Sequence, residues 1–258
     1  MMAPARRVTR HMQILLGLLL ATGCTPAQDS ARAPRYTLVV GIDVSGSFRT
    51  TGHYDDALDF AAYYMHAHLN GLGEMEVPSA LFVGSVGGEE PGEAKSFHPI
   101  HDFQDKTVEQ IAADLREWFP AEDRLTDFNA FFTRTGDELK RRGLVLTPLN
   151  IVLLTDGIPD LMTGTAEETD RYAGIDVDPL EYLSRSVTVR VLYPEPTAAV
   201  AWEQQVRRRR VRLWTTDATV MAGWRAQLEA ELPADQQTKL WAWVKDNVDF
   251  RVRRQRIF

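Results

Sequence analysis

The stretch that decides the fold runs Tyr36-Thr-Leu-Val-Val-Gly-Ile-Asp43-Val-Ser45-Gly-Ser47. Its first half is an apolar run rich in β-branched residues, which predicts a buried strand. The run stops at small polar residues, and the glycine between the two serines predicts a tight turn that aims both hydroxyls at one point. The next segment, Tyr54 to Asn70, repeats its apolar residues at helical spacing. Strand, polar loop and helix therefore follow in order.

A second apolar segment ends in the same way. Leu149-Asn-Ile-Val-Leu-Leu-Thr-Asp156-Gly157 closes on a carboxylate and then a glycine. In open α/β sheets, ligands gather outside the carboxyl ends of the strands, where the strand order reverses. We therefore expect Asp43 and Asp156 to occupy matching positions at one edge of a parallel sheet.

The rest of the chain alternates between strand and helix patterns. Strands are expected at Ala80 to Val86, Ser186 to Tyr193 and Val211 to Thr215, and helices at Val108 to Phe119, from Phe128 onward, at Thr197 to Val206 and at Ala218 to Leu232. This alternation predicts an α/β fold with a doubly wound, mostly parallel sheet and helices on both faces.

Three motifs together resemble the von Willebrand factor type A (VWA) family and its metal-ion-dependent adhesion site. Asp43-Val-Ser45-Gly-Ser47 is similar to the family's DxSxS motif, Thr126-Asp-Phe-Asn-Ala-Phe to its threonine loop, and Leu154-Thr-Asp156-Gly157 to its later aspartate. The motifs stand in family order, and the resemblance covers roughly residues 36 to 230.

The resemblance implies a role for each matching residue. Ser45, Ser47 and Thr126 would give hydroxyl ligands to a cation, and Asp43 and Asp156 would coordinate it directly or through water. Such an all-oxygen set suits Mg²⁺ or Mn²⁺. In the family, a carboxylate of a partner protein often completes the coordination, so the expected activity is binding of an acidic group on another protein.

A structural interpretation of the same residues stays open, because Ser and Asp at strand ends also cap helices and close turns without a metal. Two other threonines close to Thr126, Thr133 and Thr135, are alternative candidates for the hydroxyl ligand. Thr126 is preferred because it stands at the start of the helical stripe and the other two lie inside it. Asp127 is expected to favour the N-terminus of that helix.

Enzyme motifs fit the sequence less well. A haloacid dehalogenase-type phosphatase would need an aspartate where Ser45 stands, and neither Ser45 nor Ser85 lies in a Gly-x-Ser-x-Gly elbow. His66 and His68 point to different sides of the expected helix, and His98 and His101 lack further ligands nearby. The alternatives are a metal-dependent hydrolase and a VWA scaffold with an unoccupied site.

The N-terminus indicates export. Arg6, Arg7 and Arg10 precede an apolar run, Ile14 to Ala21, that suits a secretory signal peptide and is too short to span a bilayer. Leu20-Ala-Thr-Gly-Cys24 resembles the bacterial lipobox, in which residues 1–23 are removed and Cys24 is lipidated. Residues 24–35 would then be a tether. Thr25 is not the aspartate of inner-membrane retention, so we expect an envelope protein on the outer membrane, facing the periplasm or the surface, if the cell is Gram-negative.

Charge argues against a nucleic-acid partner. Removing the three leader arginines changes the formal charge from −7 to −10, so the exported protein would be acidic. Two basic clusters, Arg207 to Arg212 and Arg251 to Arg256, are expected to be solvated, the first at the junction of a helix and a strand. Binding of anionic phospholipid or of an acidic partner is the alternative. Cys24 is the only cysteine, which excludes a disulfide within the chain.

The expected domain spans residues 36–232. It includes a long acidic loop, Pro159 to Pro179, that follows Asp156 and should lie near the site. Residues 233–258 are expected to form a further helix packed on the domain, and an edge strand with the alternating pattern Val248, Phe250, Val252.

Overall fold

The computed structural model describes residues 36–90, 92–93, 95–121, 124–160 and 171–250. The expected signal peptide, Cys24 and the tether lie outside these residues. So do residues 161–170 of the expected acidic loop and the basic cluster Arg251 to Arg256.

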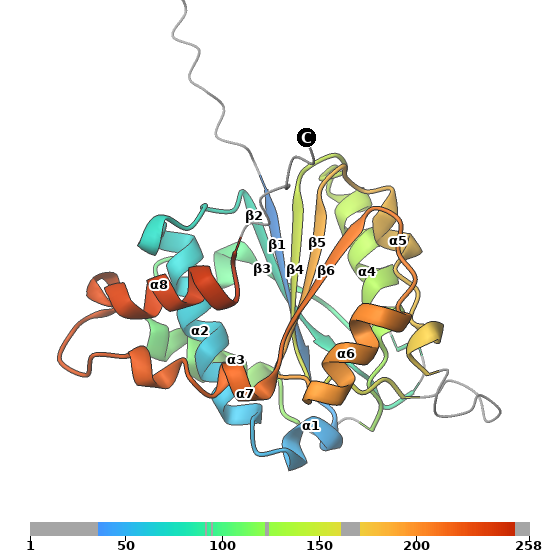
Figure 1. Ribbon diagram of the computed structural model, residues 1–258. Helices are drawn as coiled ribbons and strands as arrows, with labels where there is room; N and C mark the ends of the chain where they lie inside the picture. The colour runs from blue at the N-terminus through green and yellow to red at the C-terminus, as the bar shows by residue number, and fades with distance from the viewer. Residues whose placement is uncertain (1–35, 91, 94, 122–123, 161–170, 251–258) are drawn as a thin grey trace, which may run out of the picture. The chain divides into compact units, whose positions relative to one another are not determined.

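A six-stranded sheet runs through the centre of the fold (Figure 1). Its order is β3-β2-β1-β4-β5-β6, and all neighbouring pairs are parallel except β2 with β3. The strands are β1 (Thr37–Asp43), β2 (Ala80–Val86), β3 (His98–Pro99), β4 (Leu149–Leu154), β5 (Val187–Leu192) and β6 (Val211–Thr216). The predicted doubly wound, mostly parallel α/β fold is confirmed.

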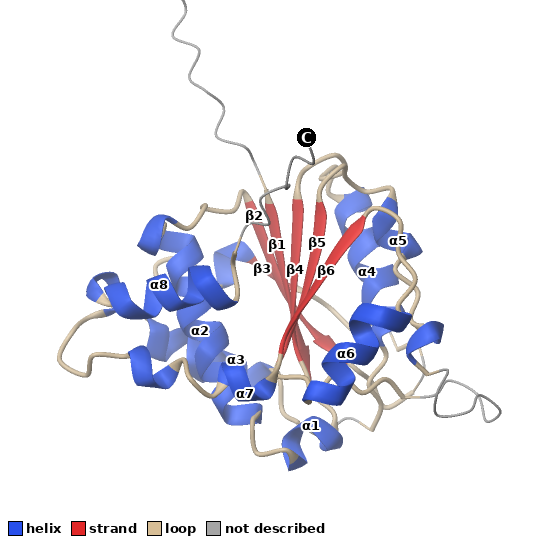
Figure 2. Cartoon of the chain, viewed as in Figure 1, coloured by secondary structure: helices blue, strands red, loops and turns tan. Residues whose placement is uncertain are grey.

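Helices pack on both faces of the sheet (Figure 2), which explains why every residue of β1, β2 and β5 is buried. Alternate residues of β1 belong to different cores: Leu38, Val40 and Ile42 join one, and Val39 joins the other. The first core includes side chains of α2 (Tyr54–Asn70), α3 (Val108–Trp118), α7 (Ala218–Met221) and α8 (Thr238–Asn247). The second includes side chains of α4 (Phe128–Arg141), α5 (Asp178–Glu181) and α6 (Pro196–Gln205).

Short helical turns complete the described part. The five-residue helix α1 (Gly46–Thr50) follows β1 directly. Single 3₁₀ turns are η1 (Leu72–Glu74), η2 (Ile100–Asp102), η4 (Tyr172–Gly174), η5 (Arg225–Gln227) and η6 (Ala234–Gln236).

The predicted long helix from Ala218 to Leu232 is wrong. Helix α7 ends at Met221, and a turn through Gly223 leads into η5. The buried Trp224 side chain donates through Nε1 to Asp56 of α2, at 2.8 Å, and Arg225 pairs with the same carboxylate. These contacts with α2 fix the segment in place of a continuous helix, so tertiary bonds override the helical pattern.

The predicted edge strand is also absent over residues 248–250, while the predicted helix before it is present as α8. The backbone carbonyls of Val248 and Phe250 accept hydrogen bonds from the Arg190 side chain, at 2.5 and 3.2 Å. A side chain of β5 thus binds these carbonyls. Val252 lies outside the described residues.

Candidate metal centre

The candidate site lies where the strand order reverses, between β1 and β4. Asp43 is the last residue of β1, and Asp156 follows β4 by two residues. The adjacent strands run parallel, so both carboxylates leave the sheet at the same edge. Helix α1 lies beside this end of the sheet (Figure 1). Such a reversal is the usual place for a ligand in an open α/β sheet.

Asp43 is fully buried and holds the site together. One carboxylate oxygen accepts from the Ser45 backbone N–H at 3.0 Å and from the Thr126 hydroxyl at 3.4 Å. The other accepts from the Thr155 hydroxyl at 2.5 Å. Burial, with the negative charge of Asp156, raises the pKa of Asp43 to about 7, although these hydrogen bonds act in the opposite direction.

The two serines lie at the start of α1 and differ in exposure. Ser45 is buried and caps the helix, since its hydroxyl accepts from Phe48 N–H at 3.4 Å. Ser47 is exposed, and its hydroxyl lies 3.0 Å from that of Ser45. Ser47 also hydrogen bonds through its side chain to Asp156. Ser45 therefore caps α1 and also lies within the candidate site, so the structural interpretation and the metal-site interpretation do not exclude each other at this residue.

Thr126 enters from a third segment, just before α4. Asp127 caps that helix by accepting from Ala130 N–H at 2.9 Å, as the sequence predicts. Thr126 is buried, whereas Thr133 and Thr135 lie inside α4, Thr133 exposed and Thr135 buried. The loop position of Thr126 is fixed by Asp160, which accepts from its N–H at 2.5 Å and donates to its carbonyl at 3.2 Å.

Asp156 is buried and stands next to other acids. One of its oxygens accepts from Ile158 N–H at 2.9 Å. Burial raises the pKa of Asp156, and the charges of Asp160 and Glu195 act in the same direction. All five predicted residues are thus joined by hydrogen bonds in one cluster: Asp43, Ser45, Ser47, Thr126 and Asp156.

Sequence reasoning missed three neighbours of this cluster. Thr155 precedes Asp156 in the strand motif, and its hydroxyl bridges Asp43 and the Gly157 N–H, at 2.5 and 2.9 Å. Its position next to a predicted ligand was the one available signal. Asp160 lies in the acidic loop that was expected near the site, but no motif singles it out. Glu195 carries no motif, and only the folded chain brings its charge to Asp156.

The residues present fit a hard divalent cation. Burial raises the pKa of Asp43, the charge of Asp156 adds to this, and a cation between the two carboxylates would offset both effects. The donors are oxygens only, which suits Mg²⁺ or Mn²⁺. Within the described ranges no group of three or more His, Cys, Asp and Glu side chains is arranged to hold a metal. Coordination here would therefore need the three hydroxyls and water in addition to the two carboxylates.

The histidines lie in other environments. His98 stacks on Trp118 with ring centroids 4.2 Å apart, and both His98 and His101 contact Asp102. His68 is a buried residue of α2, and His66 Nδ1 lies 3.2 Å from the carbonyl oxygen of Lys106. None of them joins the cluster around Asp43 in the hydrogen bonds of the described residues.

Comparison with known proteins gives matches in fold only. No protein-family model matches the chain, and no curated protein matches it. Solved structures that are similar include proximal thread matrix protein 1 from the mussel byssus, at 12% identity and TM-score 0.42, over 73% of this chain and 46% of that one. The VWA domain of SpRpn10 matches at 9% identity and TM-score 0.45, over 79% of this chain and 93% of that one. The pilus adhesin SpaC from Lactobacillus rhamnosus GG matches at 12% identity and TM-score 0.45, over 84% and 31%. The chain thus spans less than half of the mussel protein and of the adhesin.

Among the described residues, no helix has both the length and the apolar character needed to cross a bilayer.

Proposed function

We propose that this protein is a lipid-anchored, extracytoplasmic binding protein of the VWA type. Its site at the ends of β1 and β4 binds Mg²⁺ or Mn²⁺ and, through the cation, an acidic group of a partner protein. Asp43, Ser45, Ser47, Thr126 and Asp156 hold the cation. When bound, the cation supplies a positive centre that an incoming carboxylate can reach in place of a water molecule.

The observation that carries the proposal is the convergence of five oxygen-bearing side chains from three distant segments. Four of them are buried: Asp43, Ser45, Thr126 and Asp156. A purely structural cluster would not need to bury a carboxylate beside a second one, an arrangement that raises the pKa of Asp43 to about 7 through burial and through the charge of Asp156. A divalent cation supplies the missing counter-charge.

The exposure of Ser47 supports access by a partner. It joins the buried cluster through Ser45 and Asp156, yet it is exposed. A partner carboxylate approaching over α1 would therefore meet the cation from the solvent side. Arg49, also exposed and two residues further on, would favour an acidic group electrostatically.

Anchoring follows from the leader. The lipobox-like Leu20 to Cys24 would place the lipid on Cys24 and leave residues 25–35 as a link to β1, which begins at Thr37. That arrangement would present the site outside the cytoplasm, where a partner in the envelope can reach it.

Titration with Mn²⁺ tests the cation site, with free Mn²⁺ followed by electron paramagnetic resonance. We expect one saturable site, weakened at least about tenfold by Asp43→Ala and by Thr126→Ala, since each removes a ligand. Thr133→Ala is the matched control, because this exposed threonine of α4 should leave binding unchanged. Absence of saturable binding at millimolar Mn²⁺ would leave only a VWA-type scaffold without a metal. Ester or phosphate hydrolysis lost in Asp43→Ala would instead favour a metal-dependent hydrolase.

A further inference from the structure

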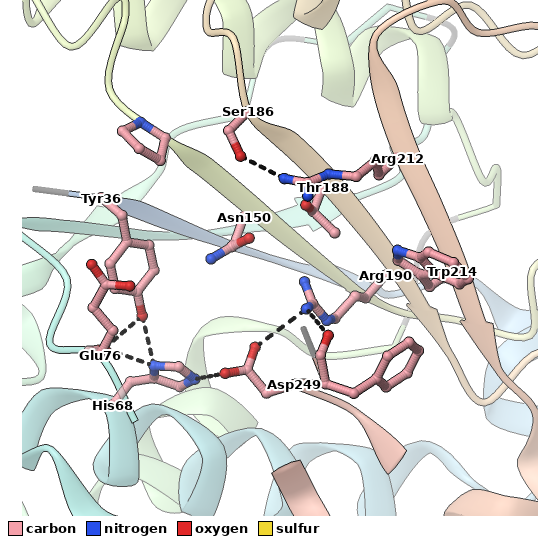
Figure 3. Close-up of a pocket in the computed structure, with 12 residues that line it drawn as sticks. Tyr36, His68, Glu76, Asn150, Ser186, Thr188, Arg190, Arg212, Trp214 and Asp249 are labelled. Atoms are coloured by element: carbon pink, nitrogen blue, oxygen red, sulfur yellow. Dashed lines mark hydrogen bonds and ion pairs between the residues drawn. The ribbon is translucent and has the colours of Figure 1, made fainter. Parts of the chain in front are cut away.

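A second polar pocket lies at the opposite end of the sheet from the candidate metal centre (Figure 3). It encloses about 300 Å³ beside the first halves of β4, β5 and β6. Its floor is made by sheet residues, among them Asn150, Thr188 and Arg190. Its other wall includes His68 from α2 and Asp249 after α8. A volume of this size suits a small molecule.

Arg190 is the central group of this pocket, and its side chain is 6% exposed. Nε donates to the Val248 carbonyl, and Nη2 donates to the Phe250 carbonyl and lies 3.5 Å from Asp249 Oδ1. Nη1 is buried and has no hydrogen-bond partner among the described residues. Figure 3 shows the guanidinium between Asn150 and Asp249. A buried charged donor without an acceptor costs more than an ordinary hydrogen bond gains, so an acceptor is expected there.

His68 provides the second unmatched group. Its Nδ1 lies 2.6 Å from the Tyr36 hydroxyl and 3.0 Å from the Glu76 carbonyl. Because the Tyr36 hydroxyl donates its one proton to that carbonyl, at 2.8 Å, both neighbours act as acceptors and the proton of the neutral ring belongs on Nδ1. Burial lowers the pKa of His68, which keeps the ring neutral. Nε2 then presents a lone pair, and the described residues give it no hydrogen-bond partner. Asp249 Oδ2, at 4.0 Å, is an acceptor itself and is too far away.

The pocket therefore offers a cationic donor on its floor and a neutral acceptor on its α2 wall. Arg212 adds a second positive charge at the rim, where its Nη2 bonds the Ser186 hydroxyl. Asp249 offsets part of the Arg190 charge through Nη2, and Glu76 adds a second acidic residue to the lining, but the buried Nη1 has no acceptor among the described residues. A ligand that satisfies both unmatched groups must carry an anionic acceptor and a hydrogen-bond donor.

We infer that this pocket binds a small carboxylate that also bears a hydroxyl or amino group. The carboxylate accepts from Arg190 Nη1 and from the amide of Asn150, and the hydroxyl or amino group donates to His68 Nε2. Trp214 lines the same space and reports on its occupation. This site is separate from the proposed cation site, so neither depends on the other.

The test uses lactate and glycine as probes and propionate, which lacks the donor group, as the matched control ligand. Binding is followed on the Trp214 indole signal by NMR, assigned among the six tryptophans with Trp214→Phe. We expect lactate or glycine to shift that signal and to bind about tenfold more tightly than propionate, the effect of one good hydrogen bond. Equal binding of all three, or no shift at about 10 mM, where a ligand with a Kd of 1 mM would be mostly bound, overturns the inference.

Variants locate the ligand. Arg190→Lys keeps the charge but loses the Nη1 donor, and Asn150→Ala removes the amide without touching the bonds to Val248 and Phe250; each should weaken binding about tenfold. The matched control is Arg207→Lys, an exposed arginine of the neighbouring basic cluster that does not line the pocket. If Arg190→Lys unfolds the protein, Asn150→Ala still decides: unchanged affinity in Asn150→Ala contradicts the assignment.

Discussion

Asp43 is the residue on which the candidate metal centre depends, and its protonation links pH to stability. Its pKa is about 7 in the folded protein, and 3.8 is the ordinary value for an aspartate. The folded state thus holds this proton more tightly than the unfolded chain does. Without metal, the proton's contribution to stability is complete below about pH 4 and is lost as the pH rises to about 7.

Asp43→Asn tests this linkage. In the presence of a chelator, raising the pH from 5 to 8 should lower the free energy of unfolding of the wild type by more than that of Asp43→Asn. The difference should be about 3 kcal/mol, because one pKa unit is worth about 1.4 kcal/mol and about two units separate pH 5 from the pKa of Asp43. Urea unfolding at the two pH values measures it. Identical pH dependence in both proteins would show that folded Asp43 does not release a proton between pH 5 and pH 8, against a pKa of about 7.

Thr155 is the neighbour that the sequence did not single out, and its hydroxyl serves two groups. It donates to Asp43 and accepts from Gly157 N–H. Thr155→Val keeps the shape but leaves the Gly157 donor unmatched, so we expect a loss of about 1–3 kcal/mol of stability. Losing the hydrogen bond should also raise the pKa of Asp43 further and weaken Mn²⁺ binding at pH 7. Urea unfolding and Mn²⁺ titration check both, and unchanged values in the two would contradict the bridging role.

At the scale of elements, β1 is positioned by its close packing. A Cβ on Gly41 would lie 2.7 to 2.8 Å from side-chain atoms of Val86, Leu153 and Phe131, which belong to three different elements. Gly41→Ala should therefore destabilise the fold by about 1–3 kcal/mol through overpacking. Gly46→Ala is the matched control, because nothing lies within 4 Å of its added Cβ. Thermal unfolding compares the two, and equal melting temperatures would contradict the packing argument.

The sequence predicted the elements that carry a regular apolar period. Strand β2 has the expected bounds, and β1, β4, α2 and α4 lie where their patterns indicate. Those patterns can be seen in the local sequence because the spacing of apolar residues follows which side of the helix or strand is buried. The rule that ligands bind where the strand order reverses then predicted a site at the ends of β1 and β4. Thr126 was chosen as its threonine because it stands just before α4.

The failures share one cause, which is bonding between segments distant in sequence. The segment after α7 is held by Asp56 of α2, and residues 248–250 by Arg190 of β5. In the candidate site, Glu195 is a neighbour of Asp156 for the same reason. No period or motif records such contacts, so they could not be read from local pattern.

At the scale of the whole molecule, the lipid anchor decides where the proposed cation site works. Cys24→Ser should shift the protein from the membrane fraction to the soluble fraction of the envelope and leave Mn²⁺ binding unchanged, because Cys24 precedes the domain by more than a dozen positions. Cell fractionation followed by immunoblotting measures the distribution. Cys24→Ser that stays with the membrane to the same extent as the wild type would contradict anchoring through this residue.

Cation binding should also stabilise the whole fold, because the site joins β1, β4 and the segment before α4, and an unfolded chain separates them. At a Mg²⁺ concentration 100 times its Kd, the gain is about 2.7 kcal/mol. Ser47→Ala should abolish most of this gain and lower the stability of the metal-free protein by only about 1 kcal/mol, since Ser47 is exposed and loses only its hydrogen bonds to Ser45 and Asp156. Thr50→Ala, exposed in the same helix, is the control that should keep the full gain. Thermal melts with Mg²⁺ and with chelator separate the two effects. A gain that persists in Ser47→Ala would mean that Mg²⁺ acts elsewhere on the protein.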